Sequence, residues 1–391
     1  MITIRVFVKK MYKLVQYTFE YLKYMVLYPI AVIKYKRHKI YLISERGDEA
    51  RDNAYHLFVY YRTHHPELEV YYAIRKGSPD REKIEKYGNI VDYKSLKHYL
   101  LFIASSYKIS THIMGFSTNR LFYFFYKNRI PMRGKTIFLQ HGITQNDLPS
   151  LYQESTDLSL FVCGAKPEFD YVSKHFHYVN GEVQYTGLAR YDALSNAVTK
   201  RQILIMPTWR LFLKNKSKTE VSDSEYVKAW NELLCDSKLV NKLEEKEIEL
   251  IFYPHYEMQK NIDLFKSVSK NVKIASFTHY DVQTLLKESA LLITDFSSVF
   301  FDFAYMGKPT VYYQFDEQEF MNNHYSKGYF DYHKMGFGEV CTSCNQVISL
   351  ISDYINNDFK ITSNFAKRID QFFVMRDTNN CKRIYNAIRK L

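Results

Sequence analysis

The chain is poor in the residues that mark disulfide scaffolds and low-complexity proteins, with 5 cysteines, 13 glycines and 9 prolines among 391 residues. An odd number of cysteines, with no signal-peptide cleavage site near the N-terminus, indicates reduced cytosolic thiols and excludes a disulfide framework. The pair Cys341-Thr-Ser-Cys344 has no second pair to complete a zinc site. There is no internal repeat, and hydrophobic residues make up 46% of the chain. We therefore expect an ordinary folded core.

Long hydrophobic runs are also missing from the strongly basic N-terminal segment. Its longest uncharged run, 24–33, is short and contains a proline, whereas a helix that spans a membrane needs about 20 apolar residues. Residues 1–40 contain nine basic residues and one acidic residue, in a chain whose net charge is +12. Because apolar and aromatic residues lie between the basic ones, we expect residues 1–37 to form an amphipathic segment on an anionic membrane surface. The alternative is a first helix packed on the domain with its charges solvated.

Short apolar runs alternate with helical patterns along most of the chain, which predicts parallel α/β layers. The expected strands lie at 39–44, 69–74, 107–110, 136–139, 158–163 and 183–185 in a first half, and at 203–206, 248–253, 272–275, 291–294 and 310–313 in a second. Residues 195–201 lack apolar periodicity and are the expected linker. We predict an N-terminal domain over 38–195, a C-terminal domain over 202–365, and a last helix over 366–391 that crosses back to the first domain. Two open sheets that face each other form a cleft, where ligands bind at the carboxyl ends of strands.

The segment 291–309 is the most informative part of the chain. Its apolar run stops at Asp295, Ser297 and Ser298 then open a helix, and Gly307-Lys308-Pro309 closes it. Such a junction places free backbone N–H groups, the positive end of a helix and two hydroxyls beside a cleft, which favours a phosphate site. The alternative is that Asp295 and the two serines only cap the helix.

Other expected strands also end in residues that can carry chemistry. These are His141 and Gly142 after 136–139, Arg190 and Asp192 after 183–185, Thr208 and Arg210 after 203–206, and His255 after 248–253. A single histidine is more often structural than catalytic, so each of these residues alone is weak evidence. Together they bring a base, cations and hydroxyls to the carboxyl ends of predicted strands, and such a cleft suits a nucleotide diphosphate.

These motifs and their order resemble the CDP-glycerol glycerophosphotransferases of teichoic acid and capsule synthesis, including their ribitol-phosphate relatives. The matching pieces, spread over about residues 38–390, are Gln140-His141-Gly142, Thr186-Gly187-Leu188-Ala189-Arg190-Tyr191-Asp192, Met206-Pro207-Thr208-Trp209-Arg210, Pro254-His255, the run from Thr294 to Asp302, Gly307-Lys308-Pro309, and the run from Tyr325 to Tyr332. Two departures stand out: Ala189 replaces a frequent proline, and Tyr256 replaces a proline after the second histidine, which bears on the acceptor pocket. The resemblance implies a GT-B-like fold, with two Rossmann-like domains facing across a cleft and the donor nucleotide held mainly by the second.

The activity that the resemblance implies is transfer of glycerol-phosphate or ribitol-phosphate from a CDP-linked donor to a hydroxyl of a lipid-linked or polymeric acceptor, with release of CMP. His141 would take the proton of the attacking hydroxyl, while His255 would stabilise the leaving phosphate. The expected donor-binding residues are Thr208, Arg210, Asp295, Ser297, Ser298 and Asp302, and the expected cleft or acceptor residues are Gly142, Arg190, Asp192 and Lys327. Asp302 could hold the ribose hydroxyls or simply face solvent, and for Asp295 a role in orienting the loop is favoured over a chemical one. No carboxylate cluster has the spacing of a magnesium site, so we expect no required cofactor, with a loosely bound divalent cation left open.

Two other functions compete with this one. A GT-B glycosyltransferase that uses a nucleotide sugar would share the cleft and the serine turn. A nucleic-acid or membrane-binding module built on the positive charge would leave the strand-end histidines unexplained, and we expect no nucleic-acid partner. The expected partners are the CDP-polyol, an anionic lipid-linked polymer and the anionic cytoplasmic face of the cell membrane, where the protein would be peripheral. The sequence does not decide between glycerol and ribitol, or between addition of one unit and of many, although limited addition or capsule synthesis is slightly favoured.

Overall fold

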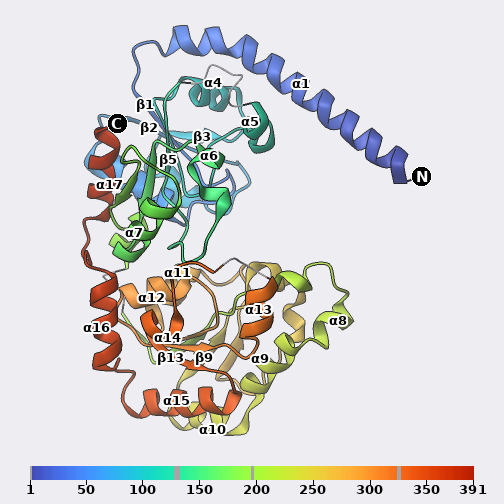
Figure 1. Cartoon of the computed structure of the whole chain (residues 1–391), viewed down its shortest axis with the longest axis vertical. Helices are drawn as coiled ribbons and strands as arrows, with labels where there is room; N and C mark the ends of the chain where they lie inside the picture. The colour runs from blue at the N-terminus through green and yellow to red at the C-terminus, as the bar shows by residue number, and fades with distance from the viewer. Residues whose placement is uncertain (1, 127–132, 195–197, 324–326) are drawn as a thin grey trace.

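Two parallel β-sheets, each covered by helices, lie one above the other in the computed structural model (Figure 1). The structure describes residues 2–126, 133–194, 198–323 and 327–391. The strands of both sheets are mostly buried, which explains why their sequences are apolar runs without alternation. Part of the expected linker, 195–197, and the first two residues of the last matching motif, 325 and 326, lie outside the described residues.

The first sheet has the strand order β3-β2-β1-β4-β5-β6-β7 among the described residues. Its strands are β1 (Ile40–Ile43), β2 (Glu69–Ile74), β3 (Ile90–Asp92), β4 (Tyr107–Ser110), β5 (Lys135–Phe138), β6 (Leu160–Cys163) and β7 (Val183–Tyr185). The helices of this domain are α2 (Asn53–His64), α3 (Arg81–Glu85), α4 (Leu96–Ala104), α5 (Arg120–Tyr126), α6 (Gln153–Thr156) and α7 (Lys166–His175), with short 3₁₀ turns η2 (Pro149–Leu151) and η3 (Ala189–Ala193).

The second sheet has the order β10-β9-β8-β11-β12-β13 in the described part of the chain. Its strands are β8 (Gln202–Ile205), β9 (Glu249–Phe252), β10 (Val272–Ile274), β11 (Leu291–Thr294), β12 (Thr310–Tyr313) and β13 (Gly338–Cys341). The helices are α8 (Lys218–Ser222), α9 (Glu225–Cys235), α10 (Ser237–Glu245), α11 (Val282–Glu288), α12 (Val299–Tyr305), α13 (Glu317–Asn323), α14 (Tyr332–Met335) and α15 (Cys344–Asn356), with η4 (Leu211–Leu213) and η5 (Tyr256–Leu264). The strands β3 and β13 were not expected from the sequence.

The C-terminal segment forms two helices, where we expected one. They are α16 (Ser363–Phe372) and α17 (Asn380–Arg389), and α17 lies against the first domain (Figure 1). Asp192 accepts hydrogen bonds from the backbone N–H groups of Asn380 and Cys381, each at 2.8 Å. Gly187 has a φ of +78°, and a side chain there would collide with Asn380. The expectation that Asp192 contacts the acceptor is therefore wrong in this arrangement, because its carboxylate fastens the start of α17.

In the part of the N-terminal helix α1 (Ile2–Lys34) whose side chains the structure describes, one face packs on the first domain. Tyr24, Leu27 and Ala31 are buried, and the Tyr24 ring stacks on Phe122 of α5 with centroids 5.3 Å apart. Tyr99 of α4 donates a hydrogen bond to the Glu20 carboxylate at 2.8 Å. Part of the helix thus follows the alternative stated above, a first helix packed on the domain.

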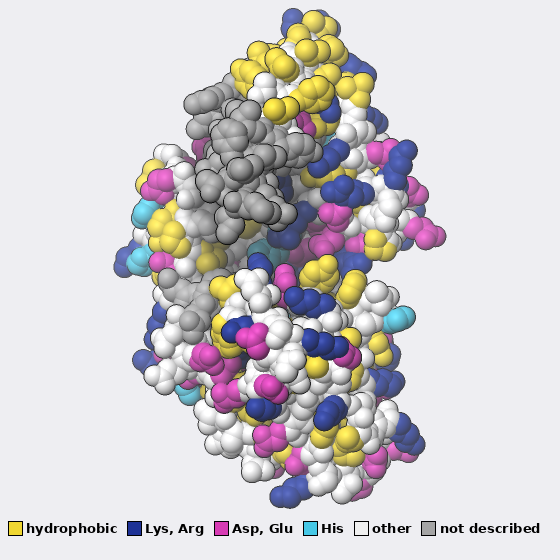
Figure 2. Space-filling model, turned by 90° about the vertical axis from the view of Figure 1, so that its right-hand side faces the viewer, with side chains coloured by type: hydrophobic (Ala, Val, Ile, Leu, Met, Phe, Trp, Pro, Cys, Tyr) yellow, Lys and Arg dark blue, Asp and Glu magenta, His cyan; other side chains and the backbone are white. Residues whose placement is uncertain are grey.

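The opposite face of α1 is apolar and exposed. It carries Phe19, Leu22, Val26, Ile30 and Ile33, at the three- and four-residue intervals of one helix face. Figure 2 shows this group of hydrophobic side chains at the upper end of the molecule. A search of the described helices finds none that combines the length and the apolar character needed to cross a membrane.

Candidate functional site

A cavity of about 620 Å³ lies between the two domains. In the first sheet the strand order reverses between β1 and β4, and in the second between β8 and β11. Ligands of open α/β sheets bind at such switch points, outside the carboxyl ends of the strands. The loops that follow all four of these strands line the cavity, through Arg46, His112, Thr208 and Ser297. The volume lies within the range typical of small-molecule sites.

His141 lies in the loop after β5 and faces this cavity. Its ring stacks on that of His112, with centroids 5.1 Å apart and planes within 3° of parallel. The His141 side chain is exposed to the cavity, but the surrounding protein excludes much of the bulk water from it. This desolvation, together with the positive charges of Arg190 and Arg46, lowers the pKa of His141 to about 4. His141 is therefore neutral at physiological pH and can accept a proton.

His112 is a site residue that the sequence did not reveal. Desolvation lowers its pKa to about 2, with further lowering from His141, Arg46 and Arg120. Its Nδ1 lies 2.9 Å from the Thr111 hydroxyl. Two neutral imidazoles thus lie face to face at the floor of the cavity.

Buried hydrogen bonds fasten the loop that carries His141. Glu168 of α7 accepts from the Gln140 side chain at 2.9 Å and from the backbone N–H groups of Thr144 and Gly164, each at 2.6 Å. Asn53 donates to the carbonyl oxygen of Gln140 at 2.8 Å. Burial raises the pKa of Glu168 to about 7, although these donors favour its charged form. The loop is therefore held rigidly before any ligand binds.

The second domain brings the serine turn directly opposite this loop. Ser297 and Ser298, between β11 and α12, line the cavity, and neither hydroxyl forms a hydrogen bond with the described residues. A Cβ added to Gly142 would lie 3.2 Å from the Ser298 Oγ, so the glycine permits the two loops to approach closely. Two features that the sequence places 155 residues apart thus form facing walls of one site.

Thr208, Trp209 and His255 complete the wall formed by the second domain. The Thr208 hydroxyl is buried without a hydrogen-bond partner in the described structure, and Trp209 stacks on His255 with centroids 6.0 Å apart. The Nδ1 atom of His255 accepts from the backbone N–H of Glu257 at 3.2 Å. In the neutral ring the proton is therefore on Nε2, which can donate a hydrogen bond. Burial lowers the pKa of His255.

Arg210 and Asp295 do not face the cavity as we expected. The Arg210 guanidinium has no exposed surface and binds Asp316 through two hydrogen bonds of 2.6 and 2.7 Å. It also pairs with Asp295 at 2.8 Å, while Asp295 accepts from the backbone N–H of Thr208 at 2.7 Å. A group held in this way cannot reach a diphosphate without breaking a buried ion pair. Arg210 and Asp295 instead hold the Thr208 loop in place.

Arg190 and Asp302 likewise lie outside the cavity lining and bind each other. The Arg190 guanidinium donates to both Asp302 oxygens, at 2.8 and 2.7 Å, and so joins the first domain to the second. It also contacts Asp52 at 2.7 Å and the His141 carbonyl oxygen at 3.0 Å. Neither expectation for Asp302, ribose binding or a solvent-facing position, describes this buried pair. Arg190 acts on the site indirectly, through the His141 loop.

Lys327 is exposed and lines a separate, much smaller cavity with Gln145 and Asn146. This cavity adjoins the main one, since Gln145 and Asn146 line both, but Lys327 is not among the described residues that line the main cavity. The described structure thus unites His141, Gly142, Thr208, His255, Ser297 and Ser298, and places Arg190, Arg210, Asp192, Asp295, Asp302 and Lys327 elsewhere.

Two arginines on the first-domain wall were not expected. Arg46 follows β1 and Arg120 begins α5, and both line the cavity. Among the described lining residues there is no carboxylate, whereas two arginines and three histidines are present. Such a lining favours an anionic ligand.

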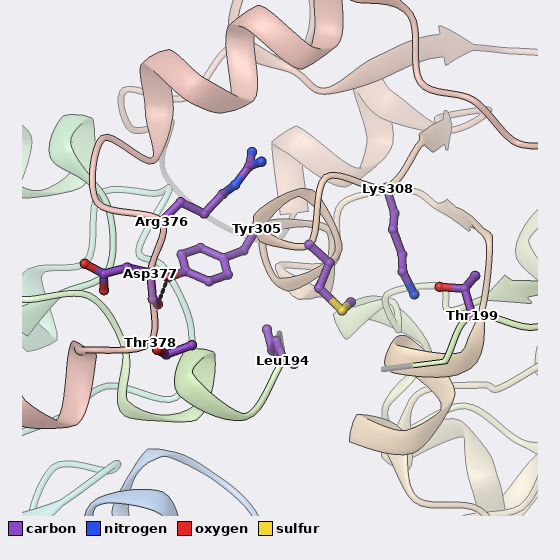
Figure 3. Close-up of a pocket in the computed structure, with 8 residues that line it drawn as sticks. Leu194, Thr199, Tyr305, Lys308, Arg376, Asp377 and Thr378 are labelled. Atoms are coloured by element: carbon purple, nitrogen blue, oxygen red, sulfur yellow. Dashed lines mark hydrogen bonds between the residues drawn. The ribbon is translucent and has the colours of Figure 1, made fainter. Parts of the chain in front are cut away.

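A second cavity, of about 450 Å³, lies on another part of the molecule near the chain crossing between the domains (Figure 3). Its Lys308 donates to the carbonyl oxygens of Leu286, Lys287 and Ser289, and burial lowers the pKa of this lysine to about 8. Tyr305 donates to the Asp377 carbonyl at 2.7 Å, as the dashed line shows. The Lys308 amine and the Tyr305 hydroxyl thus already have partners, unlike the serine hydroxyls of the first cavity.

The fold and the main cavity define a two-domain, GT-B-like architecture with a site between the domains. Comparison with known proteins gives the family. The profile described as CDP-Glycerol:Poly(glycerophosphate) glycerophosphotransferase matches residues 26–390, and the chain belongs to this family.

The chain is similar to three further known proteins. It is 36% identical over 368 residues to the minor teichoic acid biosynthesis protein GgaB of Bacillus subtilis (strain 168). The aligned region covers 91% of this chain and 40% of that protein. The chain therefore spans less than half the length of this relative. A structure of the wall teichoic acid polymerase TagF, soaked with CDPG, has a TM-score of 0.67 at 17% identity, covering 90% of this chain and 88% of that one. A putative UDP-N-acetylglucosamine 2-epimerase from Listeria monocytogenes has a TM-score of 0.55 at 15% identity, over 90% and 96%. At these identities the two structures establish the GT-B-like fold alone.

Proposed function

We propose that this chain transfers a polyol phosphate, glycerol-phosphate or ribitol-phosphate, from a CDP-linked donor to a hydroxyl of an anionic teichoic acid or capsule chain, and releases CMP. The observation that carries the proposal is the cavity at the two switch points. It has a neutral histidine on one wall, free serine hydroxyls on the other, and a lining without carboxylates among the described residues. Family membership supplies the donor class.

In the proposed step, the acceptor hydroxyl attacks the donor phosphorus that bears the polyol. A new P–O bond forms, the P–O bond to the CMP phosphate breaks, and CMP leaves with the bond electrons. His141 accepts the proton of the attacking hydroxyl, as its lowered pKa keeps it neutral. Phosphoryl transfer depends mainly on positioning and on neutralising charge, so a weak base in the right place suffices.

The second domain would hold the two donor phosphates. Ser297, Ser298 and Thr208 line this cavity, and their hydroxyls have no hydrogen-bond partner in the described structure. The Nε2–H of His255 would donate to an oxygen of the leaving CMP phosphate and stabilise its growing charge. Because α12 has only seven residues, these side chains, more than the helix dipole expected from the sequence, would bind the phosphates.

We further propose that the reaction needs no tightly bound metal. The described lining provides imidazoles, guanidinium groups and hydroxyls but no carboxylate, and carboxylates are the usual protein ligands of magnesium. Treatment with EDTA should leave the rate of CMP release unchanged. A rate lost to EDTA and restored by Mg²⁺ would contradict this.

The test of the donor is CMP release measured separately with CDP-glycerol, CDP-ribitol and UDP-N-acetylglucosamine, each with a soluble glycerol phosphate oligomer. We expect acceptor-dependent release of CMP from one CDP-polyol, with the oligomer growing by one polyol-phosphate mass. Release of UDP instead, with a sugar added to the oligomer, would show a glycosyltransferase.

We also propose that the exposed face of α1 binds an anionic membrane surface. The stripe formed by Phe19, Leu22, Val26, Ile30 and Ile33 faces away from the domain, and the exposed basic residues Lys34, Lys36 and Arg37 follow it. Apolar burial in the headgroup region combined with attraction to anionic lipid is the usual basis of interfacial binding. The acceptor would then be supplied at that surface.

The test of this surface is sedimentation with vesicles of phosphatidylglycerol and phosphatidylcholine. The double variant Phe19→Glu, Val26→Glu should bind at least tenfold more weakly, while the matched control Val179→Glu, an equally exposed valine on the first domain, should bind like the wild type. Equal binding by all three proteins would overturn the proposal.

A further inference from the structure

Arg46 and Arg120 form an unmatched pair of positive charges on the first-domain wall of the cavity. In the described part of the chain neither guanidinium forms an ion pair, whereas the buried Arg190 and Arg210 each bind carboxylates. Burial lowers the pKa of Arg46, and the nearby charge of Arg120 lowers it further, an effect larger than the opposing attraction of Glu49. The fold thus holds two repelling cations together, an arrangement that a bound anion would stabilise.

The backbone around Arg46 also has an unusual conformation. Arg46 has a φ of +57°, which is a left-handed conformation. This conformation is energetically unfavourable for a residue that has a side chain. The next residue, Gly47, packs so closely on the Tyr93 ring that a side chain would not fit there. This tight turn after β1 directs the chain at a switch point of the sheet, where ligands bind.

We infer that Arg46 and Arg120 bind a phosphodiester of the acceptor chain, next to the hydroxyl that reacts at His141. The inference rests on the proposed function and specifies where the acceptor binds. Both arginines belong to the first domain, as His112 and His141 do, whereas the free hydroxyls proposed for the donor belong to the second.

A guanidinium group suits this ligand in particular. Its planar fork donates two parallel hydrogen bonds to two oxygens of a phosphate, and it keeps its charge at any physiological pH. The stacked imidazoles lie in the same cavity as the two arginines. A polyol phosphate unit held by the arginines through its phosphate would present its free hydroxyl to the stacked imidazoles. The site therefore selects acceptors that carry a phosphate close to the terminal hydroxyl.

The test compares the variants Arg46→Gln, Arg120→Gln and the double variant with Lys76→Gln, a control that removes one positive charge from an exposed position on the same domain. The first readout is the KM for a glycerol phosphate oligomer and, separately, for the CDP-polyol. Each arginine variant should raise the acceptor KM about tenfold, with the donor KM unchanged. The control should match the wild type. An unchanged acceptor KM in the double variant, or a rise in the donor KM alone, would overturn the inference.

The second readout does not require turnover. Binding of a fluorescently labelled glycerol phosphate oligomer to the full chain is measured by anisotropy without donor. Binding by the wild type and its loss in the double variant would support the arginine site even if no CDP-polyol were turned over, so that only the proposed reaction would fail. Equal binding by the wild type and the double variant would contradict the site whether or not the reaction occurs.

Discussion

At the scale of single residues, the stacked pair His112 and His141 is the chemical centre of the site. Partial desolvation and the nearby charges of Arg46 and Arg190 lower the pKa of His141 to about 4. A base works in its deprotonated form, so activity is lost only as the pH falls through the pKa. His141 is thereby kept ready to accept a proton over the whole physiological range.

This shifted pKa predicts an unusual pH profile. The value of kcat/KM for the acceptor should stay on a plateau from about pH 8 to about pH 5 and fall only near pH 4, because the free enzyme loses its neutral base there. The measurement is initial CMP release across pH, with circular dichroism at each pH to show that the protein stays folded. Half-maximal activity near pH 6.5, the ordinary histidine value, would contradict the low pKa.

Arg210 carries a prediction about stability. Arg210→Gln would leave the carboxylates of Asp295 and Asp316 buried without their cation, which typically costs about 3–5 kcal/mol. The free energy of unfolding from urea titration should fall by that order. Arg201→Gln, which breaks an exposed pair with Asp358, is the control and should cost less than about 1 kcal/mol. A stable Arg210→Gln protein with a raised donor KM would instead support the expectation from sequence that Arg210 binds the diphosphate.

These residues show which part of the site the sequence could predict. His141, His255 and Ser297 each follow a short strand with buried apolar residues, so position alone places them at a ligand-binding edge. The role of Arg210 was misjudged because its partner Asp316 lies 106 residues away and gives no local signal. Arg46 was missed because it lies in a run of charged residues after β1, where any one of them could have faced the cavity.

At the scale of elements, the loop between β5 and η2 positions His141, and Glu168 of α7 anchors that loop. The Glu168 carboxylate now accepts hydrogen bonds from backbone and side-chain N–H groups. In Glu168→Gln the amide N–H₂ would face at least one of these N–H groups, so two donors would meet and a hydrogen bond would be lost. We expect the free energy of unfolding to fall by about 1–3 kcal/mol. We also expect kcat to fall by a larger factor than the dissociation constant of the donor changes. Thermal unfolding and CMP release measure the two effects.

The control for the loop is Glu154→Gln, since Glu154 is an exposed residue of the same domain. It should change neither quantity. A Glu168→Gln protein with full kcat would show that the loop does not depend on this anchor.

Most elements could be predicted from the sequence because their strands are buried apolar runs. The exceptions have physical reasons. The strand β3 has only three residues, of which two are apolar, and β13 begins with glycine and glutamate, so neither contains an apolar run long enough to be recognised. The C-terminal segment was expected as one helix, and its division into α16 and α17 is stabilised by the distant carboxylate of Asp192. The apolar residues of α1 were recognised, but not that they divide between a buried and an exposed face.

At the scale of the whole molecule, the two domains are joined by contacts that also shape the site. Arg190 of the first domain and Asp302 of the second form a buried pair, and the same arginine holds the carbonyl of His141. Gln145 donates to the Phe296 carbonyl across the same interface at 3.1 Å. The close approach of Gly142 and Ser298 depends on this arrangement. The geometry that places the proposed base opposite the proposed phosphate site is therefore a property of both domains together.

The measurement that tests the account most directly is acceptor-dependent CMP release from CDP-glycerol or CDP-ribitol by the wild type, His141→Asn and His112→Asn, with donor binding measured on each protein. We predict that the wild type releases CMP and that His141→Asn binds the donor normally but is slower by about 10²–10⁴-fold. His112→Asn should keep more activity than His141→Asn. Full activity in His141→Asn, or a greater loss in His112→Asn, would contradict the assignment of His141 as the base.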